Sequence, residues 1–224
     1  MVAQQVLVRE DFAFQRDYLR TKRVLDIALT LLALIPACLV MLLVAAAIWV
    51  DSPGPIFFRQ KRIGMNGREF TFFKFRSMYH KVPTSIHEQA TARWMSGHVL
   101  NETNARMPYK LGNDMRITRV GKFIRKTSID ELPQLWNVLR GDMSLVGPRP
   151  PLPYEVNLYS PHDLLRLAGK PGLTGTWQVY GRGRVTFKEM VEQDISYLET
   201  QSLRYDLKLM ILTLPVMIGG RGGA

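Results

Sequence analysis

The fold is decided by residues 27–50, IALTLLALIPACLVMLLVAAAIWV, a stretch without a charged side chain. A transmembrane α-helix needs about 20 consecutive apolar residues, so a stretch of this length predicts a membrane segment. A cleaved signal peptide is disfavoured, because the stretch begins late and continues through Ile48, Trp49 and Val50 after small residues that resemble a cleavage site. A buried core helix is disfavoured by the same length without charge.

Pro36 lies inside this stretch and bears on how it sits in a bilayer. Proline lacks a backbone N–H and clashes with the preceding helical turn, so we expect a break or a kink. Basic residues flank the stretch on both sides: Arg16, Arg20, Lys22 and Arg23, then Arg59, Lys61, Arg62 and Arg68. Basic flanks favour the cytoplasmic side. A re-entrant helix-break-helix hairpin satisfies both flanks and a single span satisfies one, but these residues alone leave both topologies open.

Composition narrows the kind of partner. The chain has 224 residues and a formal net charge of +11, which indicates an anionic partner. Nucleic acid, anionic lipid headgroups and a phosphorylated substrate would each satisfy that charge. The single cysteine, Cys38, excludes an intramolecular disulfide and a cysteine-based metal site. Composition therefore favours a membrane-associated protein that engages an anion.

The pattern along the chain predicts a mostly α-helical α+β protein in four segments. We assign residues 1–23 to an interfacial segment, 24–52 to the membrane hairpin, 53–218 to one compact domain and 219–224 to a tail. Within the domain, residues 56–60 and 69–75 are aromatic and β-branched, and the Gly/Asn-containing link between them predicts a small β-hairpin.

Apolar residues at helical spacing predict further helices around residues 117–124, 132–139, 187–198 and 203–218. Gly141 is placed to end the second of them. The last is amphipathic and is expected to lie on the bilayer surface. Residues 84–110 are predicted to form a helix followed by a loop, and the Gly/Pro-rich residues 147–151 a rigid loop.

Asp130 and Glu131 are the acidic pair to weigh for chemistry. They also fit a capping box, with Ser128 at the N-cap and Glu131 at N3, which would explain both carboxylates without catalysis. Arginines nearby in the sequence or in Gly/Pro-rich segments suit bidentate phosphate binding: Arg125, Arg140, Arg149, Arg182 and Arg184. A Mg²⁺ ion can bridge a carboxylate and a pyrophosphate, and an aspartate can itself attack phosphorus.

Longer motifs surround the acidic pair. They are KFRSM at residues 74–78, SIDELPQLWNVLRGDMSLVGPRP at residues 128–150 and PGLTGTWQV at residues 171–179, followed by Gly181-Arg182. Upstream come Lys22-Arg23 with Asp26, Pro36 and the PGP sequence at residues 53–55. In these motifs the chain resembles the bacterial sugar transferase family, the monotopic polyprenyl-phosphate phosphoglycosyl transferases, over about residues 20–215.

The resemblance implies transfer of a sugar 1-phosphate from a nucleotide diphosphate sugar to undecaprenyl phosphate, with release of UMP when the donor is a UDP-sugar. It implies that Asp130 attacks the β-phosphorus to form a phosphosugar-aspartyl intermediate, and that Glu131 and Asp130 hold Mg²⁺. Phosphate contacts are implied for Arg125, Arg149 and Arg182, and secondarily for Lys74 and Arg76. Asp194 matches a late acidic position, where a helix-surface salt bridge would explain it equally well.

The resemblance also implies a location. Lys22, Arg23 and Pro36 match the block that sets a re-entrant hairpin, so we expect a bacterial inner-membrane protein with its catalytic domain at the cytoplasmic face. It would start cell-surface glycan or exopolysaccharide assembly and would bind membrane lipid but no nucleic acid. Neither the sugar nor a homo-oligomeric state follows from these motifs.

Two rival interpretations give Asp130 a different role. In one, the same substrates react by direct attack of the lipid phosphate on the donor, and Asp130 is only a metal ligand. In the other, the chain is a membrane-anchored basic binding module without enzymatic activity, and the acidic pair has no chemical role.

Overall fold

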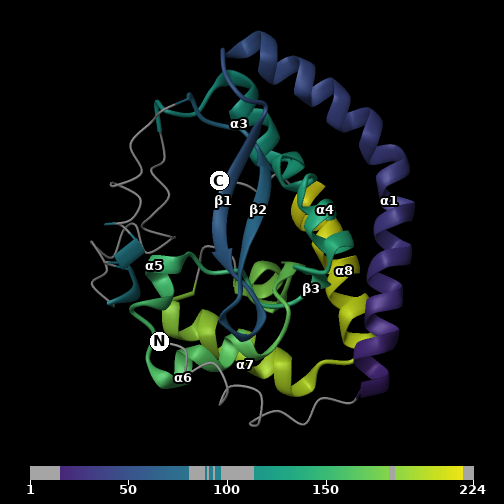
Figure 1. Cartoon of the computed structure of the whole chain (residues 1–224), viewed down its shortest axis with the longest axis vertical. Helices are drawn as coiled ribbons and strands as arrows, with labels where there is room; N and C mark the ends of the chain where they lie inside the picture. Colours follow the sequence, from purple (N-terminus) through teal and green to yellow (C-terminus); the bar gives the residue numbers. More distant parts are fainter. Residues whose placement is uncertain are drawn as a thin grey trace.

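The computed structural model describes residues 16–80, 89, 91–92, 94–96, 114–181 and 185–218. These residues are mostly helical and include two two-stranded sheets, which confirms the predicted class. The helix α1 (Arg16–Asp51) runs along one side of the molecule and bends over one end (Figure 1). The other elements form one body beside it.

The helix α1 is continuous through Pro36. The predicted helix break is therefore absent, and the re-entrant hairpin is not confirmed. A proline inside a helix removes one hydrogen bond and bends the axis, but the turns on either side can keep their own bonds. Among the described residues α1 alone is long and apolar enough to cross a membrane. Its middle is exposed at Leu31, Leu32, Ile35, Leu39, Leu42 and Leu43, which supports membrane association.

Both ends of α1 are fixed to the body. Near the N-terminal end, Lys22 Nζ lies 2.7 Å from Asp206 Oδ2, and Arg23 donates to the carbonyl oxygens of Val138 and Leu139 at 2.6 and 2.8 Å. At the C-terminal end, Asp51 Oδ2 accepts from the backbone N–H of Val120 at 3.0 Å. There, too, Val44 and Ile48 pack in an apolar cluster with Phe75 and Ile124.

The predicted β-hairpin is confirmed. Strands β1 (Phe57–Ile63) and β2 (Glu69–Phe75) pair antiparallel, with Arg62 opposite Phe70 and Gln60 opposite Phe72. The link between them turns through Asn66 at φ 56°, a left-handed conformation that asparagine tolerates better than most residues. Phe70 and Phe72 pack against Val138 of α4 (Gln134–Arg140) and against Met143, which follows that helix. One face of the hairpin therefore belongs to the core.

The helices α3 (Arg119–Lys126) and α4 (Gln134–Arg140) form close to their predicted positions, and Gly141 ends α4 at φ 85°. Between them lies a 3₁₀ turn, η5 (Ile129–Glu131). The predicted capping box at Ser128 is wrong. Ser128 has φ 57°, and its side chain makes no cap hydrogen bond because the left-handed backbone does not present it to the turn.

The remaining elements close the body around a second sheet that the sequence did not predict. Strands β3 (Ser144–Val146) and β4 (Gly172–Thr174) pair in parallel. A Cβ on Gly172 would lie 2.0 Å from the backbone nitrogen of Gly147, so this pairing requires glycine. The rest are α5 (Pro153–Val156), α6 (Pro161–Leu164), η6 (Leu165–Ala168), the π-helical turn η7 (Trp177–Gly181), α7 (Phe187–Thr200) and α8 (Leu203–Ile218).

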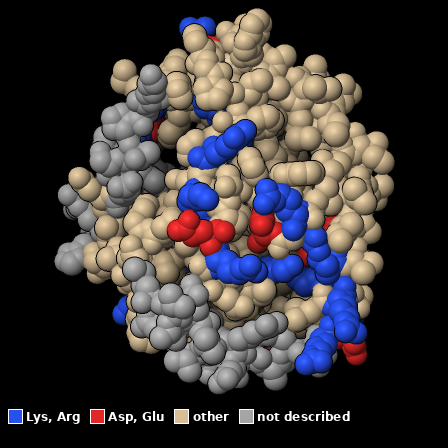
Figure 2. Space-filling model, in the orientation of Figure 1, with Lys and Arg blue, Asp and Glu red and all other residues tan. Residues whose placement is uncertain are grey.

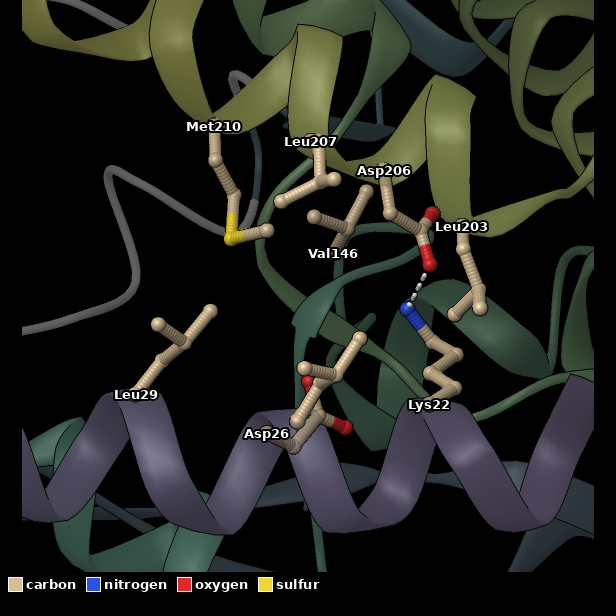
Figure 3. Close-up of a pocket in the computed structure, with 9 residues that line it drawn as sticks. Lys22, Asp26, Leu29, Val146, Leu203, Asp206, Leu207 and Met210 are labelled. Carbon is tan, nitrogen blue, oxygen red and sulfur yellow. Dashed lines mark hydrogen bonds and ion pairs between the residues drawn. The ribbon is translucent and has the colours of Figure 1, made fainter.

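The predicted helices at the C-terminal end of the chain are confirmed as α7 and α8. Helix α8 faces the N-terminal half of α1 across a small cleft, where the Lys22–Asp206 ion pair lies among apolar side chains (Figure 3). Asp206 also accepts from the hydroxyls of Tyr18 at 2.9 Å and Tyr197 at 2.6 Å. Residues 1–15 of the predicted interfacial segment, the predicted tail and most of the 84–110 segment lie outside the described residues, whereas residues 16–23 form the first turns of α1.

Candidate active site

The acidic pair lies on η5, between α3 and α4, and faces β2. The Lys74 ammonium of β2 lies 2.8 Å from Glu131 Oε1 and 3.6 Å from Asp130 Oδ2. Asp130 is 6 % exposed, whereas the Glu131 side chain is 30 % exposed. The pair therefore consists of one enclosed carboxylate and one that solvent reaches, joined through a single cation.

Burial raises the pKa of the Asp130 carboxyl above its ordinary value, and the neighbouring charge of Glu131 adds to this effect. The Lys74 ammonium opposes the rise, and Arg125 opposes it more weakly. An enclosed carboxylate is less well solvated and hence a stronger nucleophile and base than an exposed one. The environment of Asp130 thus differs from that of an ordinary helix-capping carboxylate.

Asn137 fixes the acidic pair against the hairpin. Its Oδ1 accepts from the backbone N–H of Phe73 at 3.2 Å, and its Nδ2 donates to the carbonyl of Thr71 at 2.7 Å. One side chain thereby pairs with the outer edge of β2 as a neighbouring strand would. This contact holds α4, and the η5 turn just before it, at the strand that carries Lys74. The sequence did not predict this role of Asn137, although an asparagine inside a helix, where it is disfavoured, indicates a hydrogen-bonding role.

The loop around Arg149 is held by four hydrogen bonds from three parts of the chain, β1, η6 and β4, and the rigid loop predicted from its composition is confirmed. The carbonyl of Pro148 accepts from Gly172 N–H at 2.9 Å, and that of Pro151 accepts from Ile63 N–H at 2.9 Å. Between them, the carbonyl of Arg149 accepts from Arg166 and that of Pro150 from Arg62, at 3.2 and 2.9 Å; the loop is therefore rigid.

The Arg149 side chain is paired with a buried carboxylate. Its guanidinium lies 3.1 Å from Glu155, which also accepts from the backbone N–H of Leu152 at 2.7 Å. Burial raises the pKa of Glu155, but the charges of Arg149 and Arg62 and the Leu152 bond overcome it, so the net pKa is lowered. Glu155 is consequently ionised, and its ion pair holds the Arg149 guanidinium in a fixed position.

The other residues named from the sequence fall in different places. Arg125 lies in the last turn of α3, close enough for its charge to act on Asp130. Arg76 is buried and donates to Ser52 and Pro53 just after α1, at 2.6 to 3.0 Å. Asp194 is not on a helix surface; it is 1 % exposed and pairs with the enclosed Arg166. Arg182 lies outside the described residues.

The structure thus brings Asp130, Glu131, Lys74 and Arg125 together and gives Arg76 and Asp194 internal contacts. Lysine and arginine side chains form a band on the face of the molecule drawn in Figure 2, with acidic side chains among them. The band extends toward the N-terminal end of α1. A surface with this excess of positive charge attracts anions.

The acidic pair also fits a divalent cation of the Mg²⁺ type. This ion prefers oxygen ligands and is commonly held by one or two carboxylates together with substrate phosphates. Asp130 and Glu131 are adjacent carboxylates that converge on one ammonium group, so they could both turn toward one cation. Within the described residues, no cluster of three or more Asp, Glu, His or Cys side chains could hold a metal.

The structure thus combines an exposed apolar helix, fixed at both ends to a compact body, with an enclosed carboxylate, a lysine and ordered arginines, as expected of a membrane-associated protein that engages anions. The sequence model of the family described as "Bacterial sugar transferase" matches residues 17–220. The chain therefore belongs to the bacterial sugar transferase family and is a transferase, which excludes the non-enzymatic binding module.

Relatives with informative names are similar over most of this chain. The chain is 42 % identical over 215 residues to "Galactosyl transferase CpsE" of Streptococcus agalactiae, covering 93 % of this chain and 44 % of that protein. It is 38 % identical over 202 residues to "Exopolysaccharide production protein ExoY" of Sinorhizobium fredii, covering 90 % and 87 %.

A third relative is named by its reaction. The chain is 39 % identical over 207 residues to "UDP-glucose:undecaprenyl-phosphate glucose-1-phosphate transferase" of Xanthomonas campestris, covering 88 % of this chain and 39 % of that protein. The chain thus spans less than half of some relatives and most of ExoY.

Proposed function

We propose that this protein transfers a sugar 1-phosphate from a UDP-hexose to undecaprenyl phosphate and releases UMP. The observation that carries the proposal is the pairing of enclosed Asp130 with Lys74 and Glu131 on a body tied to an apolar helix. Relatives named for UDP-sugars, undecaprenyl phosphate and exopolysaccharide production support the substrates and the role in exopolysaccharide assembly.

The proposed reaction has two displacements at one phosphorus atom. A carboxylate oxygen of Asp130 attacks the β-phosphorus, the bond to the bridging oxygen breaks, and UMP leaves with that electron pair. An oxygen of the lipid phosphate then attacks the same phosphorus, and the Asp130 carboxylate leaves as the lipid diphosphate sugar forms. Enclosure of Asp130 supports this route, because it limits the access of water to an acyl phosphate.

The side chains around Asp130 have distinct proposed tasks. Lys74 holds the carboxylate in its ionised form and balances charge on the phosphoryl group as the donor binds. Arg125 and Arg149 contact phosphate oxygens, and Arg182 is proposed for the same role. Mg²⁺ bound by Asp130 and Glu131 would supply charge neutralisation at the diphosphate. We assign Arg76 and Asp194 to holding the site's surroundings in place.

The membrane arrangement proposed here is re-entrant, with the active site at the cytoplasmic face of the inner membrane. The contacts of Lys22 and Asp51 support it, because both ends of α1 bind the same water-exposed body. A helix that crossed the bilayer would put its ends about 30 Å apart on opposite sides. The exposed apolar middle around Pro36 would then enter one leaflet only.

Turnover and topology test this proposal separately. The purified protein, incubated with Mg²⁺ and single UDP-hexoses, should release no more than one equivalent of UMP by itself, and should release UMP catalytically only when an excess of polyprenyl phosphate is added. Failure with every UDP-hexose would reject the proposed reaction. For topology, Arg16→Cys and Pro55→Cys in a Cys38→Ser background should both react with an impermeant maleimide in inverted vesicles. Labelling of Arg16→Cys from the outside of spheroplasts would reject the re-entrant arrangement.

A further inference from the structure

One face of the β-hairpin carries two cations that flank the same aromatic ring. Residues directly opposite in an antiparallel pair lie on one face, so Arg62, Phe72 and Lys74 share a face of β1–β2. The Arg62 guanidinium carbon lies 5.2 Å from the centre of the Phe72 ring, and Lys74 Nζ lies 5.7 Å from it. Lys74 forms an ion pair with Glu131 of the acidic pair, whereas Arg62 donates a hydrogen bond to Pro150 in the loop around Arg149.

Arg62 is held firmly but retains hydrogen-bonding capacity. Its two terminal nitrogens donate to the carbonyl of Pro150 and to Gln60 Oε1, each at 2.9 Å. A guanidinium has five N–H donors in a fixed fork. Two of them are used within the part of the chain that the structure describes, and the buried Nε–H has no hydrogen-bond partner there.

The charges around Arg62 favour an anion. Burial and the adjacent Arg149 charge lower the pKa of Arg62 to about 10, against the smaller opposing effects of Glu155, Tyr154 and Glu131. Arg62 stays cationic at neutral pH, so the charges of two guanidinium groups act on the one buried carboxylate of Glu155, which forms its hydrogen bonds with Arg149 and Leu152. An anion placed against both guanidiniums relieves their repulsion.

We propose that Arg62, together with Arg149, binds the phosphate that carries the nucleoside, while Lys74 and the acidic pair bind the phosphate that carries the sugar. This inference rests on the proposed function and gives the donor a direction, with its sugar phosphate at Lys74 and its nucleoside phosphate at Arg62 beside the Arg149 loop. As the bridging P–O bond breaks, the electron pair goes to the nucleoside phosphate, and Arg62 stabilises that added charge. Arg62 is thus a further substrate-binding residue of the first displacement, and it has no contact with the second.

UMP binding to the full chain in nanodiscs tests this role, because UMP contains only the phosphate assigned to Arg62. Arg62→Gln should weaken UMP binding by about tenfold or more, as expected for loss of a charge-assisted hydrogen bond. Arg59→Gln is the matched control. Arg59 is an exposed arginine of the same strand on the opposite face, beside Phe73, and its loss should change UMP binding by less than about twofold.

The half-reactions separate binding from a merely structural role. Arg62→Gln should slow loading of the protein by the UDP-sugar but leave transfer from the loaded protein to the lipid phosphate at the wild-type rate. If Arg62→Gln fails to fold by thermal melting, Arg62→Lys keeps the charge without the fork and should bind UMP about threefold more weakly or worse.

Wild-type affinity for UMP in a folded Arg62→Gln variant, or in Arg62→Lys where the first variant does not fold, overturns the inference. The proposed function survives that result as long as the wild-type protein turns over a UDP-sugar. If the wild-type protein turns over no UDP-sugar, the proposed function itself has failed.

Discussion

Removing Lys22 should reveal how strongly α1 is clamped to the body. Lys22→Met keeps the length of the side chain but leaves the Asp206 carboxylate buried without its cation. Breaking a buried ion pair by removing one partner costs about 3–5 kcal/mol. We expect the lower end, about 3 kcal/mol, because the hydroxyls of Tyr18 and Tyr197 still donate to the carboxylate. Burial and Asp206 raise the pKa of Tyr197 well above its usual value, so that hydroxyl remains a donor.

The assay is thermal unfolding of the full chain in nanodiscs, followed by tryptophan fluorescence. A loss of 3 kcal/mol should lower the Tm by about 6–12 °C for a chain of this size. Arg20→Met is the matched control, since Arg20 is an exposed cation of the same helical end, and it should cost less than about 0.5 kcal/mol. A loss of less than about 1 kcal/mol in the free energy of unfolding of Lys22→Met would contradict the claim that this ion pair fixes α1 to the body, because exposed ion pairs contribute no more than that.

Three further variants probe the site and its support. Asp130→Asn should abolish turnover yet raise the Tm at pH 7. Because the pKa of the Asp130 carboxyl is raised in the folded state, its contribution to stability is present below the unfolded-state pKa and is lost as pH rises through the folded-state pKa. Asparagine does not ionise, so the variant avoids that loss. A lower Tm would point to a capping role instead. Lys74→Gln should move the acid limb of the kcat/KM–pH profile to higher pH, because Lys74 is the largest influence that lowers the pKa of Asp130; an unmoved limb assigns that limb to another group. Asn137→Ala should cost about 2–3 kcal/mol in chemical denaturation by leaving the Phe73 N–H and Thr71 C=O unpaired, and a cost below 0.5 kcal/mol would show that water replaces the amide.

The hairpin and the main helices could be predicted from the sequence because local signals agree with the packing. Strands β1 and β2 are aromatic and β-branched around a link whose Asn66 takes a left-handed conformation. Gly141 ends α4 because its φ of 85° suits glycine. In both cases the sequence pattern and the tertiary contacts favour the same structure.

The misplaced features depend on contacts between residues distant in sequence. Ser128 fits a capping box locally, but packing of η5 against β2 imposes a left-handed backbone there. The strands β3 and β4 are three residues each, too short for alternation to show, and their pairing depends on the close approach of Gly147 and Gly172.

The site shows the same division. Motif resemblance named Asp130 and Glu131, but spacing gave no indication that Lys74, 57 positions from Glu131 along the chain, would join them. The partners of Asp194 and Asp206, namely Arg166 and Lys22, lie 28 and 184 positions away. Only the folded chain shows that Asp194 and Asp206 form internal ion pairs that stabilise the fold, whereas Asp130 is enclosed beside Lys74 at the candidate site.

The covalent intermediate is the central claim, and trapping it is the most direct test. The full chain, incubated with Mg²⁺ and a UDP-sugar labelled in the β-phosphate and then quenched before any lipid phosphate is added, should carry the label on the peptide containing Asp130. The label should be absent from Asp130→Asn and should be discharged from the wild-type protein by polyprenyl phosphate. An unlabelled protein that still turns over at the normal rate would contradict the account and favour direct attack of the lipid phosphate on the donor.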